Sequence, residues 1–143
     1  MIGLIISGHG NFASGMRSSL KLISGEQDNV EFVDFEENDS IDTLKEKYMA
    51  SLENLKECTG ILALCDLTGG SPFKTLVELK ISLNKPMEVI GGSNLPMLIE
   101  ISMTKDFIDN LSALTNSAID TGKNGVCKYE YIVHEELECE DGI

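Results

Sequence analysis

The sequence is poor in positive charge. Its 143 residues hold 11 Lys and Arg against 24 Asp and Glu, which gives a formal net charge of −13. Nucleic acids and anionic membranes are bound through dense positive patches, so neither is an expected partner, and a basic protein surface is favoured instead. Arg17 is the only arginine. The chain therefore cannot build the bidentate arginine clamps that often hold phosphate, and a bound phosphoryl group must rest mainly on backbone amides.

The sequence also lacks the spacings of a metal site and of a targeting segment. The four cysteines, at positions 58, 65, 127 and 139, form no CxxC pair, and neither histidine lies at a zinc-finger distance from them. Structural zinc is not expected, and the scattered cysteines favour reduced thiols over a disulfide framework. The first apolar run ends at Ser7 without a basic flank and is too short for a membrane span or a signal core. A cytoplasmic location is the default expectation.

The composition predicts one globular domain. Hydrophobic residues make up 42% of the chain and no internal repeat is present, which is sufficient for a single core. We assign residues 1–133 to this domain and residues 134–143 to an acidic tail. The second histidine, His134, lies in that tail beside two glutamates and is read as a surface residue.

Strand and helix patterns alternate along the chain. Short apolar runs at residues 2–6, 30–34, 61–65 and 87–90 predict buried parallel strands, and helical periodicity follows each of them, at residues 12–23, 41–55, 72–81, 96–103 and from Phe107 to Ala118. Right-handed crossovers then give an α/β fold with a doubly wound, mostly parallel sheet in the order 2-1-3-4. The alternating segment from Val126 to Val133 holds two tyrosines and predicts a fifth, antiparallel strand at a sheet edge.

Two loops carry the candidate chemistry. Ser7-Gly8-His9-Gly10 follows the first strand and Asp66-Leu67-Thr68-Gly69-Gly70-Ser71-Pro72 follows the third. In the order 2-1-3-4 these strands are neighbours, so His9 and Asp66 leave the sheet side by side at the switch point. A carboxylate that accepts a hydrogen bond from Nδ1–H leaves Nε2 of the imidazole unprotonated, which is the state that phosphorylation of a histidine nitrogen requires.

Glycines and a helix start next to this pair predict a place for a phosphoryl group. Gly10, Gly69 and Gly70 would let backbone N–H groups approach it. Ser71 is the predicted N-cap, with Pro72 at the first helical position, so the positive end of the helix dipole and the Ser71 hydroxyl would also face the group.

These residues resemble enzyme IIA of the mannose class of the bacterial phosphoenolpyruvate-dependent sugar phosphotransferase system. The likeness extends to about Val133. The matching stretches are Ser7-Gly8-His9-Gly10 with Ala13 and Gly15, Asp66 to Phe73, Val89-Ile90-Gly91-Gly92, Asn94-Leu95-Pro96-Met97-Leu98, and Thr121-Gly122.

The resemblance implies roles and partners. His9 would be the phosphorylated nucleophile, Asp66 the residue that orients its imidazole, and Ser71 a phosphate contact. The phosphocarrier protein HPr would be the donor and the IIB component the acceptor, with the IIC and IID membrane components downstream. The resemblance also implies a homodimer that exchanges the last strand, and no cofactor. The chain shows no Ala/Pro-rich linker or IIB domain, so it resembles a free-standing component. Leu67 and Thr68 differ from those members of the family that have Thr-Trp at these two positions.

Three alternatives are open to different degrees. A histidine phosphatase needs arginines around the phosphate and a second histidine, and here Gly8 stands in place of the motif's arginine. A phosphoryl carrier for dihydroxyacetone kinase would use the same His9 but a kinase subunit as acceptor. A non-catalytic regulatory domain of the same fold would not need His9 and Asp66 together. The transported sugar is not specified by the sequence.

Overall fold

The structure, a computed structural model, describes residues 1–131 of the chain. The predicted acidic tail with His134, and the last two residues of the predicted fifth strand, lie outside the described residues. The elements in chain order are β1 (Ile2–His9), α1 (Phe12–Ser24), β2 (Val30–Phe35), α2 (Ile41–Asn54), β3 (Gly60–Cys65), α3 (Ser71–Ser82), β4 (Met87–Ile90), α4 (Leu95–Thr104) and α5 (Leu111–Asn124).

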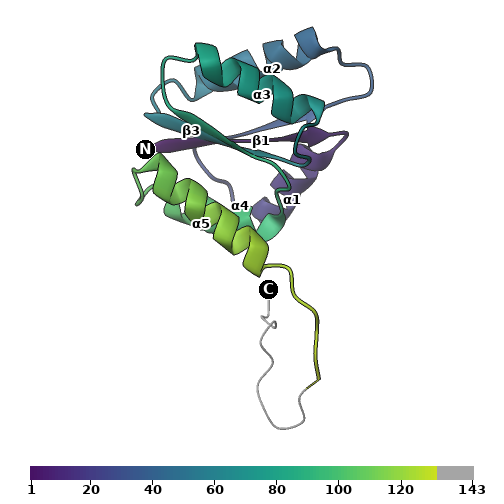
Figure 1. Ribbon diagram of the computed structural model, residues 1–143, viewed down its shortest axis with the longest axis vertical. Coiled ribbons are helices and arrows are strands. Elements are labelled where there is room, and N and C mark those ends of the chain that lie inside the picture. The colour runs from purple at the N-terminus through teal and green to yellow at the C-terminus, as the bar shows by residue number, and fades with distance from the viewer. Residues whose placement is uncertain (132–143) are drawn as a thin grey trace.

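The four strands form one sheet in the order β2-β1-β3-β4, with every neighbouring pair parallel. This confirms the predicted fold class and strand order. Helices α2 and α3 lie side by side on one face of the sheet, and α1, α4 and α5 cover the other (Figure 1). The β1–β3 register pairs Ser7 with Cys65, so the loops that follow these two strands begin at the same level of the sheet.

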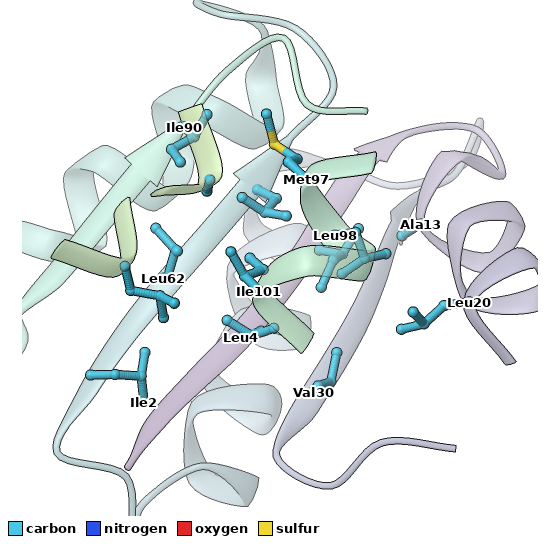
Figure 2. Packing of buried hydrophobic residues seen from close by; sticks show 14 residues of the cluster. Ile2, Leu4, Ala13, Leu20, Val30, Leu62, Ile90, Met97, Leu98 and Ile101 are labelled. Atoms are coloured by element: carbon cyan, nitrogen blue, oxygen red, sulfur yellow. The ribbon is translucent and has the colours of Figure 1, made fainter. Parts of the chain in front are cut away.

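Alternation along the strands divides the core into two layers. Leu4 and Ile6 of β1 point to the layer under α1, α4 and α5, where Leu98 and Ile101 pack against the sheet (Figure 2). Ile5, between them, points to the layer under α2 and α3. Because both faces of β1 are buried, the strand is a nearly continuous apolar run, as parallel strands usually are.

Capping residues set where the helices begin. The Ser40 side chain accepts a hydrogen bond from the Thr43 N–H at the start of α2, as predicted. Helix α5 begins at Leu111 and not at Phe107, because the Asn110 side chain caps it, and the Phe107 side chain is exposed. The N-cap of α3 is Gly70, the last residue with extended backbone, so the prediction of Ser71 at this position is wrong by one residue.

The chain runs away from the body after α5 (Figure 1). Residues 126–131 form no strand, so the predicted edge strand is not formed within the single chain over this segment. A strand needs a partner for its ladder hydrogen bonds, and this stretch meets none in its own sheet. Exchange of the strand between two subunits remains a prediction.

Two further expectations concern the state of the cysteines and the absence of a membrane span. Cys58 and Cys65 are free and buried, in line with the expectation of reduced thiols for these two residues. Along residues 1–131, no helix has the length and apolar character that a membrane span requires.

Candidate functional site

His9 stands at the point where β1 emerges from the core. The seven residues before it in the strand are buried, whereas the His9 side chain is 45% exposed. The strand therefore holds the backbone of His9 rigidly and presents its imidazole to solvent, at the carboxyl end of the sheet where open α/β folds place their ligands.

Asp66 meets His9 as predicted. Its Oδ2 atom lies 2.9 Å from the backbone nitrogen of His9 and 2.9 Å from Nδ1 of the ring. An ionised carboxylate only accepts hydrogen bonds, so the neutral imidazole must carry its proton on Nδ1 and present Nε2 as a lone pair. The pair thus selects the tautomer needed for attack through Nε2.

The environment of Asp66 favours its charged form. Burial acts to raise the pKa of this carboxyl, but the hydrogen bonds from the backbone and ring of His9 outweigh it, and the pKa is lowered. The backbone of Leu67 contributes to the same lowering, although Oδ1 has no partner that meets hydrogen-bond geometry within residues 1–131. Asp66 is therefore a fixed acceptor at neutral pH.

Two neighbours limit the movement of the His9 ring. Phe35, at the end of β2, makes an edge contact with it at a centroid distance of 5.9 Å. On another side lies Gly70, where a Cβ atom would come within 2.9 Å of His9 Cε1. Only glycine fits at that approach, so the backbone just before α3 can lie against the imidazole.

The N-terminus of α3 beside this ring is open. The side chains of Ser40, Asn94 and Asn110 cap α2, α4 and α5, whereas Gly70 offers no side chain to cap α3. Within residues 1–131, the N–H groups of Ser71 and Phe73 have no hydrogen-bond partner. Free first-turn amides and the helix dipole together favour an anion at this position.

Two of the predicted phosphate-binding amides are already used. The Gly10 N–H donates to the Phe35 carbonyl at 2.8 Å, which extends the β1–β2 ladder by one residue, and the Gly70 N–H donates to the Leu67 carbonyl at 3.2 Å, which closes a turn. In this structure both amides therefore have backbone acceptors, and the prediction that these glycines line a phosphate site stays a prediction. Gly69, at φ 82°, and Ser71 stay available in the described chain.

The loop between β4 and α4, residues 91–94, packs against the loop that follows Asp66. A Cβ atom at Gly91 would lie 2.6 Å from Cα of Thr68, so glycine is required for the two loops to pack. The Ser93 N–H also donates to the Cys65 carbonyl at 3.0 Å. Leu67 is held at the surface by this arrangement, with 58% of the residue exposed next to Asp66.

Sequence reasoning missed a buried polar group beneath the site. Tyr48 of α2 is fully buried and its hydroxyl lies 2.6 Å from Oγ of Ser7, two residues before His9. The sequence marks Tyr48 only as one of the apolar positions of a helix. The predicted strand at residues 30–34 also ends before Phe35, and the sequence carries no signal that this residue contacts His9. Among residues 1–131, no group of three His, Cys, Asp or Glu is placed to hold a metal ion.

Comparisons with known proteins agree on one family. A family model described as "PTS system fructose IIA component" matches residues 3–119. The chain is 37% identical over 125 residues to the PTS system mannose-specific EIIAB component of Escherichia coli (strain K12), covering 87% of this chain and only 38% of that protein. It is 35% identical over 124 residues to the PTS system fructose-specific EIIA component of Bacillus subtilis (strain 168), covering 82% and 84% of the two chains.

Solved structures give the same result. The crystal structure of phosphotransferase system component EIIA from Streptococcus agalactiae superposes with a TM-score of 0.82 at 32% identity, covering 90% of this chain and 97% of that one. A mannose/sorbose specific IIA subunit from Enterococcus faecalis shares the fold, with a TM-score of 0.80 at 24% identity and coverage of 91% and 96%. With its His9 and Asp66 side by side at the sheet's switch point, this chain belongs to the PTS system fructose IIA component family, the IIA components of the mannose and fructose class.

Proposed function

We propose that this protein is a cytoplasmic phosphoryl carrier that accepts a phosphoryl group from HPr on Nε2 of His9 and passes it to a IIB component for sugar uptake. The observation that carries the proposal is the double contact of Asp66 Oδ2 with the backbone and the ring of His9. It supports a neutral imidazole with a free, outward Nε2 lone pair, which is what a histidine nucleophile needs.

The transfer step exchanges one N–P bond for another. The Nε2 lone pair attacks the phosphorus of a donor phosphohistidine, and the donor's N–P bond breaks with its electron pair returning to the donor imidazole. As Nε2 becomes bonded, positive charge develops on the His9 ring, and the Asp66 carboxylate at Nδ1 stabilises it. The reverse sequence at a IIB histidine would regenerate neutral His9.

The open start of α3 supplies donors for the phosphoryl oxygens. The N–H groups of Gly69, Ser71 and Phe73 and the Ser71 hydroxyl are the groups we assign to this contact, in place of the N–H groups of Gly10 and Gly70. Gly10 and Gly70 keep a steric role, since they permit the backbone to turn and to approach the ring. The backbone amides also compensate for the single arginine of the chain.

Partners beyond the donor belong to the same proposal. The chain spans 38% of the length of the E. coli relative, whose name includes a B component. We infer that a separate IIB component accepts the group here, that IIC and IID membrane components act downstream, and that the protein works as a homodimer. Residues 1–133 would form the IIA domain.

The test is the mass of the intact protein after incubation with phosphoenolpyruvate, enzyme I and HPr. We expect wild type to gain one phosphoryl group that is lost in mild acid, because phosphohistidine hydrolyses there and phosphoserine does not. His9→Ala should gain none. Ser71→Ala is the matched control, because the Ser71 hydroxyl is the other candidate acceptor of the phosphoryl group. This variant should still be phosphorylated, at a reduced rate.

Two results would contradict the proposal. A wild-type protein that gains no mass would leave only the fold and the family in place. An acid-stable group lost in Ser71→Ala would move the acceptor from His9 to the serine. A further arm offers the phosphorylated protein to a IIB component and to a dihydroxyacetone kinase subunit, and transfer to the kinase alone would replace the assigned acceptor.

A further inference from the structure

The Tyr48 hydroxyl links the two loops of the site from below. It lies 2.6 Å from Oγ of Ser7 on β1 and 3.4 Å from the carbonyl oxygen of Pro72 in the first turn of α3. Ser7 is two residues before His9, and Pro72 directly follows Ser71. One side chain from α2 thus contacts both segments whose relative position defines the site, although within residues 1–131 no hydrogen bond joins it to His9 or Ser71.

The hydrogen-bond directions follow from the available protons. Two hydroxyl protons serve three contacts: Ser7 Oγ donates to the Val33 carbonyl of β2 at 2.8 Å, and the Tyr48 hydroxyl shares its proton between Ser7 Oγ at 2.6 Å and the Pro72 carbonyl at 3.4 Å. The phenol remains protonated because burial raises its pKa well above the ordinary value. The chain of contacts therefore fixes α2, β1 and β2 to one another in a fully buried place, where such bonds are costly to break.

The separation of β1 and α3 matters because their contact is tight. The backbone at Gly70 leaves no room for a Cβ against the His9 ring. A shift of the first turn of α3 by a fraction of an ångström would change both the freedom of the imidazole and the place of the Ser71 amide. The rate of a transfer reaction depends strongly on such displacements, since a misplacement of about 1 Å costs on the order of 100-fold in rate.

We propose that Tyr48 is a positioning residue: its hydroxyl, through Ser7 and the Pro72 carbonyl, sets the distance between His9 and the open N-terminus of α3. The inference rests on the proposed carrier function. Tyr48 exchanges no proton with the reacting groups and acts only through its neighbours.

The test measures phosphoryl transfer from phosphorylated HPr in single turnovers, at saturating donor, alongside the dissociation constant of the complex. Tyr48→Phe keeps the packed ring and removes the hydroxyl. We expect its transfer rate to fall about ten-fold with unchanged donor affinity. The loss of the buried hydroxyl would change the position of His9 relative to α3, but not the surface on which the donor docks. Ser7→Ala removes the other half of the short bond and should act similarly, and the double variant should be no slower than either single one.

Leu55→Ala is the control for a general loss of stability. Leu55 belongs to the same core layer as Tyr48, but it contacts the opposite end of β1, where a Cβ at Gly3 would meet it. We expect a lowered melting temperature and a normal transfer rate. Equal slowing in Leu55→Ala and Tyr48→Phe would overturn the positioning role, and so would a wild-type rate in folded Tyr48→Phe. If Tyr48→Phe does not fold, a wild-type rate in Ser7→Ala overturns it.

A second readout separates this inference from the proposed function. The NMR resonances of the His9 ring and of the Ser71 amide should shift in Tyr48→Phe and stay in place in Leu55→Ala, whether or not the protein is phosphorylated. A wild-type protein that accepts no phosphoryl group, together with these shifts, would refute the carrier function and keep the positional role. Unchanged resonances in Tyr48→Phe would refute the positional role.

Discussion

A single oxygen of Asp66 accepts two hydrogen bonds from His9, one from its backbone nitrogen and one from Nδ1 of its ring, each at 2.9 Å. The backbone contact fixes where the residue stands and the ring contact fixes how the imidazole is turned. Because both end on the same atom, a change at that oxygen alters the position and the tautomer of His9 together.

Asp66→Asn should slow phosphorylation of His9 by about 100-fold without abolishing it. The neutral amide still accepts through its oxygen, but it no longer stabilises positive charge on the ring, and its NH2 group would be buried where Oδ1 lacks a partner. The measurement is the single-turnover rate with phosphorylated HPr. Asp120→Asn, an exposed change on α5, should transfer at the wild-type rate. Wild-type kinetics in Asp66→Asn would remove the carboxylate from the site.

The same variant should change the acid stability of the protein. The pKa of Asp66 in the folded protein lies below its ordinary value of 3.8, so its charged form stabilises the fold above that pH and this contribution is lost as pH falls through the lowered pKa. Urea unfolding at neutral pH should find Asp66→Asn less stable than wild type. The difference should shrink in titrations below pH about 4, and a difference that grows in acid would contradict the assignment.

Gly70→Ala should impair transfer while leaving the fold intact. The backbone at this residue has φ −73° and ψ 172°, which alanine adopts freely, but its Cβ would lie 2.9 Å from Cε1 of His9. We expect the imidazole to be displaced from Asp66 and the transfer rate to fall about ten-fold. The matched change is Gly15→Ala in α1, where a Cβ meets nothing. It should stabilise the protein by about 0.5–1 kcal/mol and transfer normally, and equal kinetics for the two variants would show that the close approach is unimportant.

Lys85→Met should lower stability without touching the chemistry. The ammonium of Lys85 donates to the carbonyls of Leu55, Lys56 and Cys58, beyond the end of α2 and far from His9 in the sheet. Losing a charged donor to these partly buried carbonyls should cost about 2 kcal/mol in urea unfolding.

Lys56→Met is the comparison for that measurement, because within residues 1–131 its exposed ammonium is paired only with the exposed Glu53. Its cost should stay under about 0.5 kcal/mol. Similar costs for the two lysines would mean that the carbonyl contacts of Lys85 add nothing to the fold.

The sheet and the central pair of the site could be predicted from sequence for one physical reason. Parallel strands end at a common edge, so a residue just after one buried run and a residue just after its neighbour must meet. This places His9 beside Asp66 before any coordinate is known. The predicted order 2-1-3-4 is confirmed, and the site follows from it.

The remaining details depend on contacts that spacing does not contain. Whether the N–H groups of Gly10 and Gly70 are open depends on how far a ladder or a turn continues, and here both are used. Tyr48 has the spacing of an apolar helix position, and the partner of its hydroxyl follows only from how deeply and at what rotation α2 packs on the sheet. The N-cap of α3 is Gly70, one residue before the predicted Ser71, because Ser71 itself is already helical.

The burial pattern of β1 also bears on whether two partners can act at the same time. Seven buried residues lead to one imidazole that is 45% exposed, so the ring meets solvent at the carboxyl edge of the sheet. Any donor and any acceptor of a group on that nitrogen must use the same approach and must come in turn. One partner has to leave before the next arrives, and the two would compete for the same surface.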